Sequence, residues 1–305
     1  MKKLSIVVPA YNEADSIRPF LDAIAALGLA NPYEIIFVDD GSRDGTLAAV
    51  KSAAETDERI RYVSFSRNFG KEAALYAGLE HAVGELIVTM DADLQHEPKL
   101  IPEMLAAVET EGYDSAAVSR TARRNESKVR GYLAKKYYAL MNRYSEVPLK
   151  DGSMDFRLMT REFVNAVLSL KEQGRFTKGI YQWVGFKTKW IETETDARKG
   201  GPSKWTLEGL FAYAINSIIA FSNAPLKLAS VLGVVSCAGA TVYAAFILLS
   251  WLITGSHVSS IAVLAAAVVF LGGLQLFVIG ILGLYVAGIF RETKNRPLYI
   301  VKEAK

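Results

Sequence analysis

The chain has 305 residues, of which 51% are hydrophobic, and a formal net charge of +3 at pH 7. This length allows one large domain or a domain with an appendage, and the composition and balanced charge exclude a disordered protein and one that coats nucleic acid. The only cysteine, Cys237, excludes a disulfide bond within the chain.

The first 120 residues alternate between short apolar runs and helical stretches. The N-terminal apolar run stops at Pro9 and is too short for a signal peptide, so it is interpreted as a first strand. Strands are expected at Leu4–Val8, Glu34–Val38, Ile60–Phe65, Leu86–Met90 and Ser115–Val118. Helices are expected at Ala14–Leu27, Thr46–Glu55, Lys71–Val83 and Pro98–Thr110. This alternation predicts an α/β fold with a mostly parallel sheet covered on both faces.

Polar clusters follow four of the expected strands. They are PAYNE (Pro9–Glu13), DDGSRDGT (Asp39–Thr46), SRNFGK (Ser66–Lys71) and DADLQH (Asp91–His96). Ligands of parallel α/β sheets bind at the carboxyl ends of the strands, so all four clusters would meet at one edge. Any one of them could be an ordinary turn, but together they predict an active site. The chain lacks the glycine-rich dinucleotide fingerprint and the P-loop motif.

Asp91 and Asp93 stand two residues apart, directly after a buried strand. A solvated turn is the simpler interpretation, because aspartate is common where strands end. A carboxylate pair also suits Mg²⁺ or Mn²⁺, which keep few protein ligands and bind substrate phosphates as well. Gln95 and His96 could support such a site, whereas one cysteine and three histidines argue against zinc. The residues alone predict a metal-dependent enzyme acting on a phosphorylated nucleotide.

Residues 228–290 contain no Asp, Glu, Lys or Arg. Thr254–Ser260 divides them into 228–253 and 261–290, each long enough to cross the ~30 Å hydrocarbon core of a bilayer. A buried helical hairpin in a soluble core is the alternative. Basic residues flank the two expected spans at Lys199, Lys204, Lys227, Arg291, Lys294 and Arg296. The connecting stretch has no lysine or arginine, so the positive-inside rule places both chain ends in the cytoplasm.

Two further segments are suited to a membrane surface. Lys128–Ser145 is basic and rich in aromatic residues, as an interfacial helix would be, although a solvated helix packed on the sheet has the same pattern. Residues 205–227 carry an apolar stripe, and Lys199–Trp205 is either a mobile lid or a plain linker. The expected organisation is a catalytic domain (1–204), an interfacial segment (205–227), a transmembrane hairpin (228–290) and a cytoplasmic C-terminal tail (291–305).

Four stretches of the sequence are recognisable: SIVVPAYNE, VDDGSRDGT, RNFGKEAALYAGLEHAVGELIVTMDADLQHEP and DGSMDFRLMTREF. They resemble the family 2 glycosyltransferases with a GT-A fold, and more narrowly the polyprenyl-phosphate glycosyltransferases, which include dolichol-phosphate mannose synthases and bactoprenol glucosyltransferases. The resemblance covers essentially the whole chain. It implies a Rossmann-like GT-A domain followed by interfacial helices and two transmembrane helices. Processive synthases of the family have a Q-x-x-R-W motif that Tyr181–Phe186 lacks.

The resemblance also implies roles for individual residues. The donor nucleotide site would contain Pro9, Tyr11, Glu13, Asp40, Lys71 and Asp91. The metal ligands would be Asp91, Asp93 and Gln95. The catalytic residues would be Asp91, Asp93 and Asp155, of which Asp155 lies near the acceptor. Cations for the acceptor and donor phosphates would be Arg120, Arg123, Arg130 and Lys204.

The implied reaction is inverting transfer of a hexose from a nucleotide sugar to undecaprenyl phosphate, with Mg²⁺ or Mn²⁺. UDP-glucose is the first choice of donor. UDP-GlcNAc, UDP-galactose and GDP-mannose are alternative donors. An ionised lipid phosphate is already a nucleophile, so no strong general base is required. The product would serve glycan or cell-envelope modification. The implied location is the bacterial inner membrane, with the catalytic domain and both termini cytoplasmic, and the implied assembly is a homo-oligomer, with a tetramer as one candidate.

Three other functions fit parts of this pattern. A transporter regulated by the first domain would need ionisable residues in its spans, and these spans have none. A catalytically inactive nucleotide-sugar sensor would not need an intact metal motif. A membrane-anchored glycosyltransferase with a water-soluble acceptor would need no lipid phosphate. No nucleic-acid partner is expected.

Overall fold

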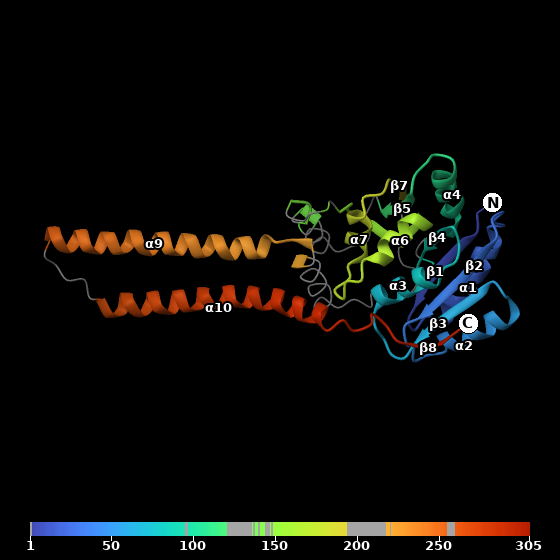
Figure 1. Ribbon diagram of the computed structural model, residues 1–305, viewed down its shortest axis with the longest axis horizontal. Helices are drawn as coiled ribbons and strands as arrows, with labels where there is room; N and C mark the ends of the chain where they lie inside the picture. Colours follow the sequence, from blue (N-terminus) through green and yellow to red (C-terminus); the bar gives the residue numbers. More distant parts are fainter. Residues whose placement is uncertain are drawn as a thin grey trace.

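A computed structural model describes residues 2–94, 97–120, 136, 138–139, 141–143, 147, 149–193, 218–219, 221–254 and 260–305. These residues form an α/β domain and two long helices that extend from one end of it (Figure 1). The first and the last strand of the chain both belong to the sheet of the domain. The chain therefore leaves the domain to form the two helices and then returns to it.

The domain is built on one eight-stranded sheet with the strand order β7-β5-β6-β4-β1-β2-β3-β8. The strands are β1 (Leu4–Ala10), β2 (Tyr33–Asp39), β3 (Ile60–Phe65), β4 (Leu86–Thr89), β5 (Ser115–Arg120), β6 (Ser153–Thr160), β7 (Thr188–Thr193) and β8 (Val301–Ala304). Strands β1 to β4 pair in parallel with one another, and β5 pairs in parallel with β7. Strands β6 and β8 run antiparallel to their neighbours. The predicted α/β fold with a mostly parallel sheet is confirmed.

Helices cover both faces of this sheet. One face packs against α1 (Ala14–Ala26), α2 (Thr46–Thr56) and α4 (Ile101–Glu109), which follows the 3-10 turn η1 (Pro98–Leu100). The other face packs against α3 (Lys71–His81), α6 (Arg161–Ser169) and α7 (Thr177–Trp183). In β1, Ile6 and Val8 pack on the first side and Val7 on the second. Burial on both sides explains why these strands are apolar at consecutive positions.

Gly78 allows α3 to lie close to the sheet. A Cβ atom at this position would overlap the side chain of Val7 and come within 3.2 Å of Cγ2 of Val38. No larger residue would fit without moving the helix, because packed interiors leave little free space. The close packing fixes the position of α3, and with it the position of Lys71, the first residue of that helix.

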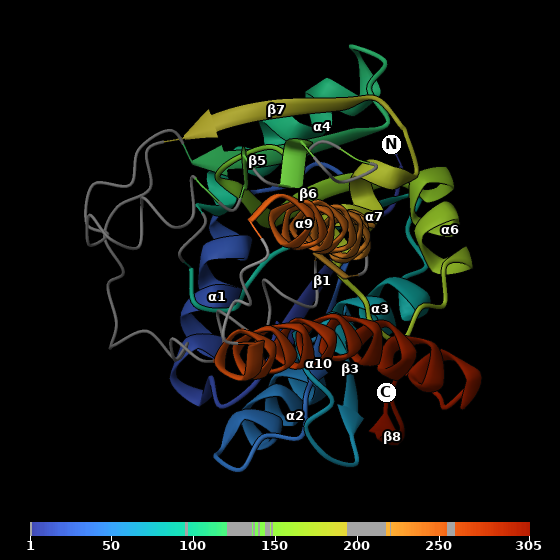
Figure 2. The same ribbon diagram turned by 90° about the vertical axis from the view of Figure 1, so that its left-hand side faces the viewer.

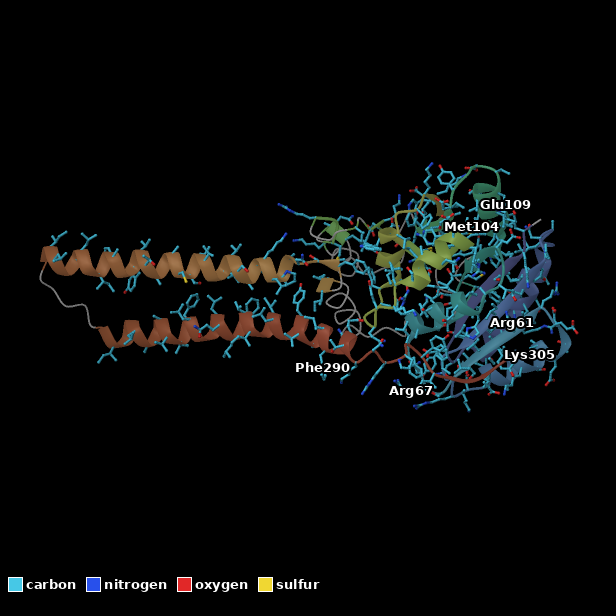
Figure 3. All side chains as sticks on the ribbon, viewed as in Figure 1. Arg61, Arg67, Met104, Glu109, Phe290 and Lys305 are labelled. Carbon is cyan, nitrogen blue, oxygen red and sulfur yellow. The ribbon has the colours of Figure 1, made fainter. Side chains whose placement is uncertain are left out.

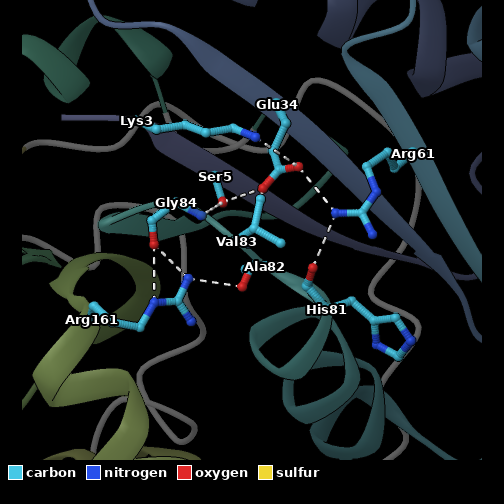
Figure 4. A network of polar contacts seen from close by, with 9 residues as sticks. All are labelled: Lys3, Ser5, Glu34, Arg61, His81, Ala82, Val83, Gly84 and Arg161. Atoms are coloured by element: carbon cyan, nitrogen blue, oxygen red, sulfur yellow. Dashed lines mark hydrogen bonds and ion pairs between the residues drawn. The ribbon is translucent and has the colours of Figure 1, made fainter. Parts of the chain in front are cut away.

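A polar network stabilises the amino-terminal edge of the sheet (Figure 4). The buried carboxylate of Glu34 accepts hydrogen bonds from Ser5 Oγ at 2.6 Å, Val83 N at 3.0 Å and Arg61 Nη1 at 3.1 Å. Burial alone would raise the pKa of Glu34, but these hydrogen bonds and a nearby lysine outweigh it, so the pKa is lowered. Arg161 donates to two backbone carbonyls just before β4. The network lies at the opposite edge from the carboxyl ends of β1 to β4.

The helices α9 (Ala224–Thr254) and α10 (Ser260–Thr293) contact each other and project away from the domain (Figures 1 and 3). They contain two candidate membrane spans, Ala224–Ile247 with a mean hydropathy of 1.8 and Ala267–Thr293 with 2.4. Among the described residues of the two spans, only Ala229 is buried, and the others are exposed or half-exposed. The core helix of a soluble protein would be buried, whereas helices that are apolar on all sides and uncovered are suited to lipid.

Residues after α10 return to the edge of the sheet. Strand β8 pairs antiparallel with β3, and Lys305 exchanges backbone hydrogen bonds with Tyr62. The Tyr299 ring stacks on Phe65 with 4.8 Å between the ring centroids, and its hydroxyl donates to Glu80 at 2.5 Å. Figure 2 shows β8 next to β3, on the side of the domain where α2 lies. The segment 291–305, described above only as a tail, thus contains an edge strand.

Candidate active site

Hydrogen bonds join the loops that follow β1 and β2. Asn12 N donates to Ser42 Oγ at 3.0 Å, and Arg43 N donates back to Asn12 Oδ1 at 2.9 Å. Glu13 N donates to Thr46 Oγ1 at 2.8 Å. Asn12 has a φ of 53°, a left-handed conformation that asparagine adopts more readily than most residues. These two polar clusters meet at the carboxyl edge of the sheet, as the sequence predicts.

Asp40 holds the loop that follows β3. Its carboxylate is 3% exposed and accepts hydrogen bonds from the backbone amides of Phe69 at 2.6 Å and Gly70 at 2.9 Å. Burial raises the pKa of Asp40, and the two amides oppose that effect. The neighbouring Gly41 has a φ of 67°, and a Cβ there would lie 2.5 Å from the carbonyl carbon of Arg67. The loops after β2 and β3 are therefore in direct backbone contact.

Lys71 links the third and fourth polar clusters to β6. Its ammonium group lies 2.7 Å from Asp91 Oδ1 and 2.6 Å from Asp155 Oδ2. Burial alone would lower the pKa of Lys71, but the charges of Asp155 and Asp91 outweigh it and raise the pKa. Lys71 is thus a cation shared by two carboxylates. The sequence assigns it to the donor nucleotide, and this close contact with both acidic residues was not foreseen.

Asp91 and Asp93 follow β4 at the carboxyl edge of the sheet, and the Asp91 side chain is 26% exposed. Within the described part of the chain, which omits residues 95 and 96, no three Asp, Glu, His or Cys side chains gather closely enough to hold a metal ion. Two carboxylates nevertheless fit Mg²⁺ or Mn²⁺, since such ions take one or two protein ligands together with substrate phosphates and water. The donor set therefore suits an ion that arrives with a phosphorylated substrate.

Asp155 lies on β6, on the same side of the sheet as α3. Its backbone carbonyl accepts a hydrogen bond from Thr89 Oγ1 at 2.8 Å, which joins β6 to the end of β4. Lys71 contacts Oδ2 of Asp155, and Lys178 of α7 lies 3.7 Å from Oδ1. The carboxylate is 22% exposed, so a substrate can reach it between the two lysines. The structure therefore brings Asp91 and Asp155 together, although 63 residues separate them in the sequence.

A small pocket opens beside Asp155, and we call it the Arg157 pocket. Its polar and aromatic lining consists of Lys150, Ser153, Arg157, Lys178, Tyr181, Gln182 and Trp190. Sequence reasoning did not select any of these residues for a site. The available signal was in β6 itself, where Asp155 and Arg157 are the only polar residues between Met154 and Met159, stand two residues apart and therefore share one face of the sheet.

The remaining predicted residues fall into two groups. Pro9 ends β1 together with Ala10, Tyr11 is 36% exposed on the following loop, and Arg120 ends β5. Arg120 N donates to Gly152 O at 2.9 Å, which places Arg120 at the same edge of the sheet as Asp155. Predicted residues that lie outside the described ones are Gln95, Arg123, Arg130 and Lys204. The segment Lys199–Trp205 and most of Lys128–Ser145 also lie outside the described residues. The roles assigned to all of these residues stay predictions.

The fold is that of a GT-A glycosyltransferase. The mannosyl-3-phosphoglycerate synthase of Rubrobacter xylanophilus has a similar crystal structure, with a TM-score of 0.51 and 19% sequence identity. The similarity covers 71% of this chain and 72% of that protein. At this level of identity the likeness supports the fold and nothing finer.

Sequence comparison defines the family. Residues 5–168 match Glycosyl transferase family 2. The uncharacterized glycosyltransferase sll0501 of Synechocystis sp. (strain ATCC 27184 / PCC 6803 / Kazusa) is 38% identical over 305 residues, which are 99% of this chain and 95% of that one. A prophage bactoprenol glucosyl transferase homolog of Escherichia coli (strain K12) is 36% identical over 305 residues and 99% of both chains. The chain belongs to glycosyl transferase family 2.

Proposed function

We propose that this protein is an inverting, metal-dependent hexosyltransferase that transfers glucose from UDP-glucose to polyprenyl phosphate at the cytoplasmic face of a bacterial inner membrane. One observation carries the proposal. The acidic cluster around Lys71 and the two exposed apolar helices belong to one chain, and the bactoprenol glucosyl transferase homolog matches 99% of that chain, helices included. A water-soluble glycosyltransferase would have no use for such helices.

The donor side of the reaction needs positive charge where the diphosphate leaves. Asp91 and Asp93 would hold Mg²⁺ or Mn²⁺, and the bound ion would act as a Lewis acid on the departing diphosphate. Lys71 adds a fixed ammonium group next to Asp91, at 2.7 Å. Fixed charges of this kind stabilise a transition state because they need no rearrangement during the reaction. The polar loops after β1 and β2 supply the surface for the nucleotide.

The acceptor side needs little activation. The second pKa of a phosphate monoester is about 6, so a lipid phosphate is largely ionised at neutral pH and attacks without a strong base. Asp155 would position the attacking phosphate and the cations around it, because Lys71 and Lys178 approach its two different oxygens. Direct in-line attack inverts the anomeric centre, so an α-linked nucleotide sugar would give a β-linked lipid phosphate sugar.

The membrane helices bring the site to the lipid. Each buried methylene of a lipid is worth about 0.8 kcal/mol, so a long polyprenyl chain stays in the bilayer. The beginning of α9 and the end of α10 both lie at the domain (Figure 1). The flanking residues Lys227, Arg291 and Lys294 therefore lie on the same side as the domain, and the positive-inside rule makes that side the cytoplasm.

Transfer of radiolabelled sugar to undecaprenyl phosphate tests the proposal. Purified full-length protein is incubated with Mg²⁺ or Mn²⁺ and, separately, with UDP-glucose, UDP-GlcNAc, UDP-galactose or GDP-mannose. We expect label in the lipid phase with UDP-glucose, and its loss with EDTA and with Asp93→Ala. A proton NMR spectrum of the product should show the β anomer, whereas an α product would exclude direct inversion.

Two other results would redirect the proposal. Label on the lipid from a different nucleotide sugar would keep the acceptor and change the donor. Metal-dependent donor binding without any lipid product would point to a water-soluble acceptor. The homo-oligomer, with four copies as the first candidate, is tested separately by light scattering of the detergent-solubilised protein.

A further inference from the structure

Arg157 is a buried cation with an unusual set of neighbours. Its side chain is 2% exposed and lies on β6, two residues from Asp155 and on the same face of the sheet. The ring centroids of Tyr181 and Trp190 lie 4.8 Å and 5.3 Å from its guanidinium carbon. Aromatic faces stabilise a cation, and more strongly when water is excluded. The two aromatic rings therefore hold the Arg157 side chain in place but do not neutralise its positive charge.

Arg157 lacks a carboxylate partner within the described ranges. Its Nη1 donates to the hydroxyls of Ser115 at 3.0 Å and Thr188 at 3.2 Å, whereas its Nε has no hydrogen-bond partner. Burial lowers the pKa of Arg157 to about 10, although the charge of Asp155 opposes the shift. A buried cation that is not ion-paired with a carboxylate is costly, and such residues are candidates for ligand sites.

Two further groups make the Arg157 pocket suitable for an oxyanion. The Tyr181 hydroxyl is buried near the Thr89 hydroxyl but makes no hydrogen bond of normal geometry with a described residue. Lys178 stands at the pocket with its ammonium group 2.8 Å from the carbonyl oxygen of Ser153 and 3.7 Å from Asp155. An N–H of arginine, a phenol and an ammonium group can all donate to one phosphate.

We propose that the Arg157 pocket receives one oxygen of the phosphate of the acceptor lipid, with Arg157 and Lys178 as the ligands of that phosphate. Lys178, which lines the pocket, lies 3.7 Å from Asp155 Oδ1, whereas Lys71, which also contacts Asp91, lies 2.6 Å from Asp155 Oδ2. The assignment rests on the proposed function and gives a role to two residues, Arg157 and Lys178, for which the family resemblance implies none.

Separate Michaelis constants for the two substrates test this assignment. In the full-length protein, Arg157→Gln should raise the KM for undecaprenyl phosphate at least about tenfold, the effect of one charged hydrogen bond. The KM for UDP-glucose and the Kd for UDP should stay within about twofold of the wild type. Inorganic phosphate should compete with the lipid in the wild type and lose this effect in Arg157→Gln. Lys178→Gln should also raise the KM for the lipid. Because this variant keeps the buried arginine, it can test the assignment if Arg157→Gln fails to fold.

Arg161→Gln is the matched control. Arg161 is an arginine four residues further on, and its hydrogen bonds lie at the amino-terminal edge of the sheet. The Arg161→Gln variant should leave the KM for the lipid and the KM for UDP-glucose unchanged, even if it lowers the melting temperature. An unchanged KM for the lipid in folded Arg157 and Lys178 variants would overturn the assignment. The pocket would then be a site for water only. A raised KM for UDP-glucose with an unchanged lipid KM would also overturn it, because the pocket would then bind the donor.

Binding of radiolabelled undecaprenyl phosphate without any donor separates this inference from the proposed function. Binding that depends on Arg157, with no sugar transfer from any donor, would support the pocket and contradict the proposed transfer. Sugar transfer with Arg157-independent lipid binding would contradict the pocket alone.

Discussion

At the scale of the single residue, Lys71 is the group on which the acidic cluster depends. Without its ammonium group, Asp91 and Asp155 would lose their shared cation and repel each other. We expect Lys71→Met to lower kcat/KM for sugar transfer about 100-fold, the usual effect of removing one fixed charge from a transition state. Lys99→Met is the control, since Lys99 pairs with Glu97 at the surface. Wild-type activity in Lys71→Met would show that the bridge has no catalytic role.

Gly41 is the point at which the two nucleotide-side loops touch. A methyl group there would press on the backbone of Arg67, and the residue also needs a φ of 67°. Gly28 has a similar φ of 55° but nothing within 4 Å of the Cβ position. We expect both alanine variants to lose about 1 kcal/mol of stability from backbone strain. Only Gly41→Ala should also weaken UDP binding, measured by calorimetry. Equal UDP affinities in the two variants would mean that the loop contact does not shape the nucleotide site.

Some site residues could be predicted from the sequence and others could not. Asp91 and Asp93 follow an apolar strand, and the rule that ligands lie at the carboxyl ends of parallel strands places them correctly. Asp155 came from the family resemblance, with no spacing argument behind it. Arg157 and Lys178 were missed because their importance arises from burial and from partners that are distant in the sequence. An arginine in a strand does not reveal by itself whether a carboxylate faces it.

At the scale of the element, Glu34 joins β2 to the residues before β4. Its pKa is lowered from an ordinary 4.5, so it stabilises the folded state above that pH and loses this effect as the pH falls through the folded pKa. We expect Glu34→Gln to lower the free energy of unfolding by about 2 kcal/mol near neutral pH. The difference from the wild type should shrink as the pH falls below about 4.5 in denaturant titrations. A difference independent of pH would mean that the charge of Glu34 adds nothing.

The five expected strands appear within two residues of their predicted ends, and three further strands were not predicted. Apolar runs mark β1 to β5 because both faces of those strands are buried. Strand β6 is interrupted by Asp155 and Arg157, β7 is half-exposed, and β8 has the sequence Val-Lys-Glu-Ala. Such segments become strands because a neighbour offers free backbone groups, and that neighbour lies far away in the sequence. For β8 the partner is β3, more than 230 residues earlier.

At the scale of the whole molecule, the reactivity of the Cys237 thiol can show whether α9 lies in lipid or in water. This cysteine is exposed on α9, within the candidate span Ala224–Ile247. A thiol in lipid does not form the reactive thiolate, so we expect a charged maleimide to leave it unlabelled in intact vesicles and to label it after denaturation. Lys302→Cys in a Cys237→Ser background is the control, and it should react in inside-out vesicles. Rapid labelling of native Cys237 would place α9 in water.

The return of the chain through β8 determines how the domain is held. A domain attached to the helices by one flexible linker could rotate freely. The α/β domain of this protein is attached at two places, at the start of α9 and through β8 after α10. Glu292, at the end of α10, also accepts hydrogen bonds from the backbone of Gln173 and Gly174. Two attachments restrict the rotation of the domain about the helices more than one would, so we expect the same side of the domain to face α9 and α10 throughout.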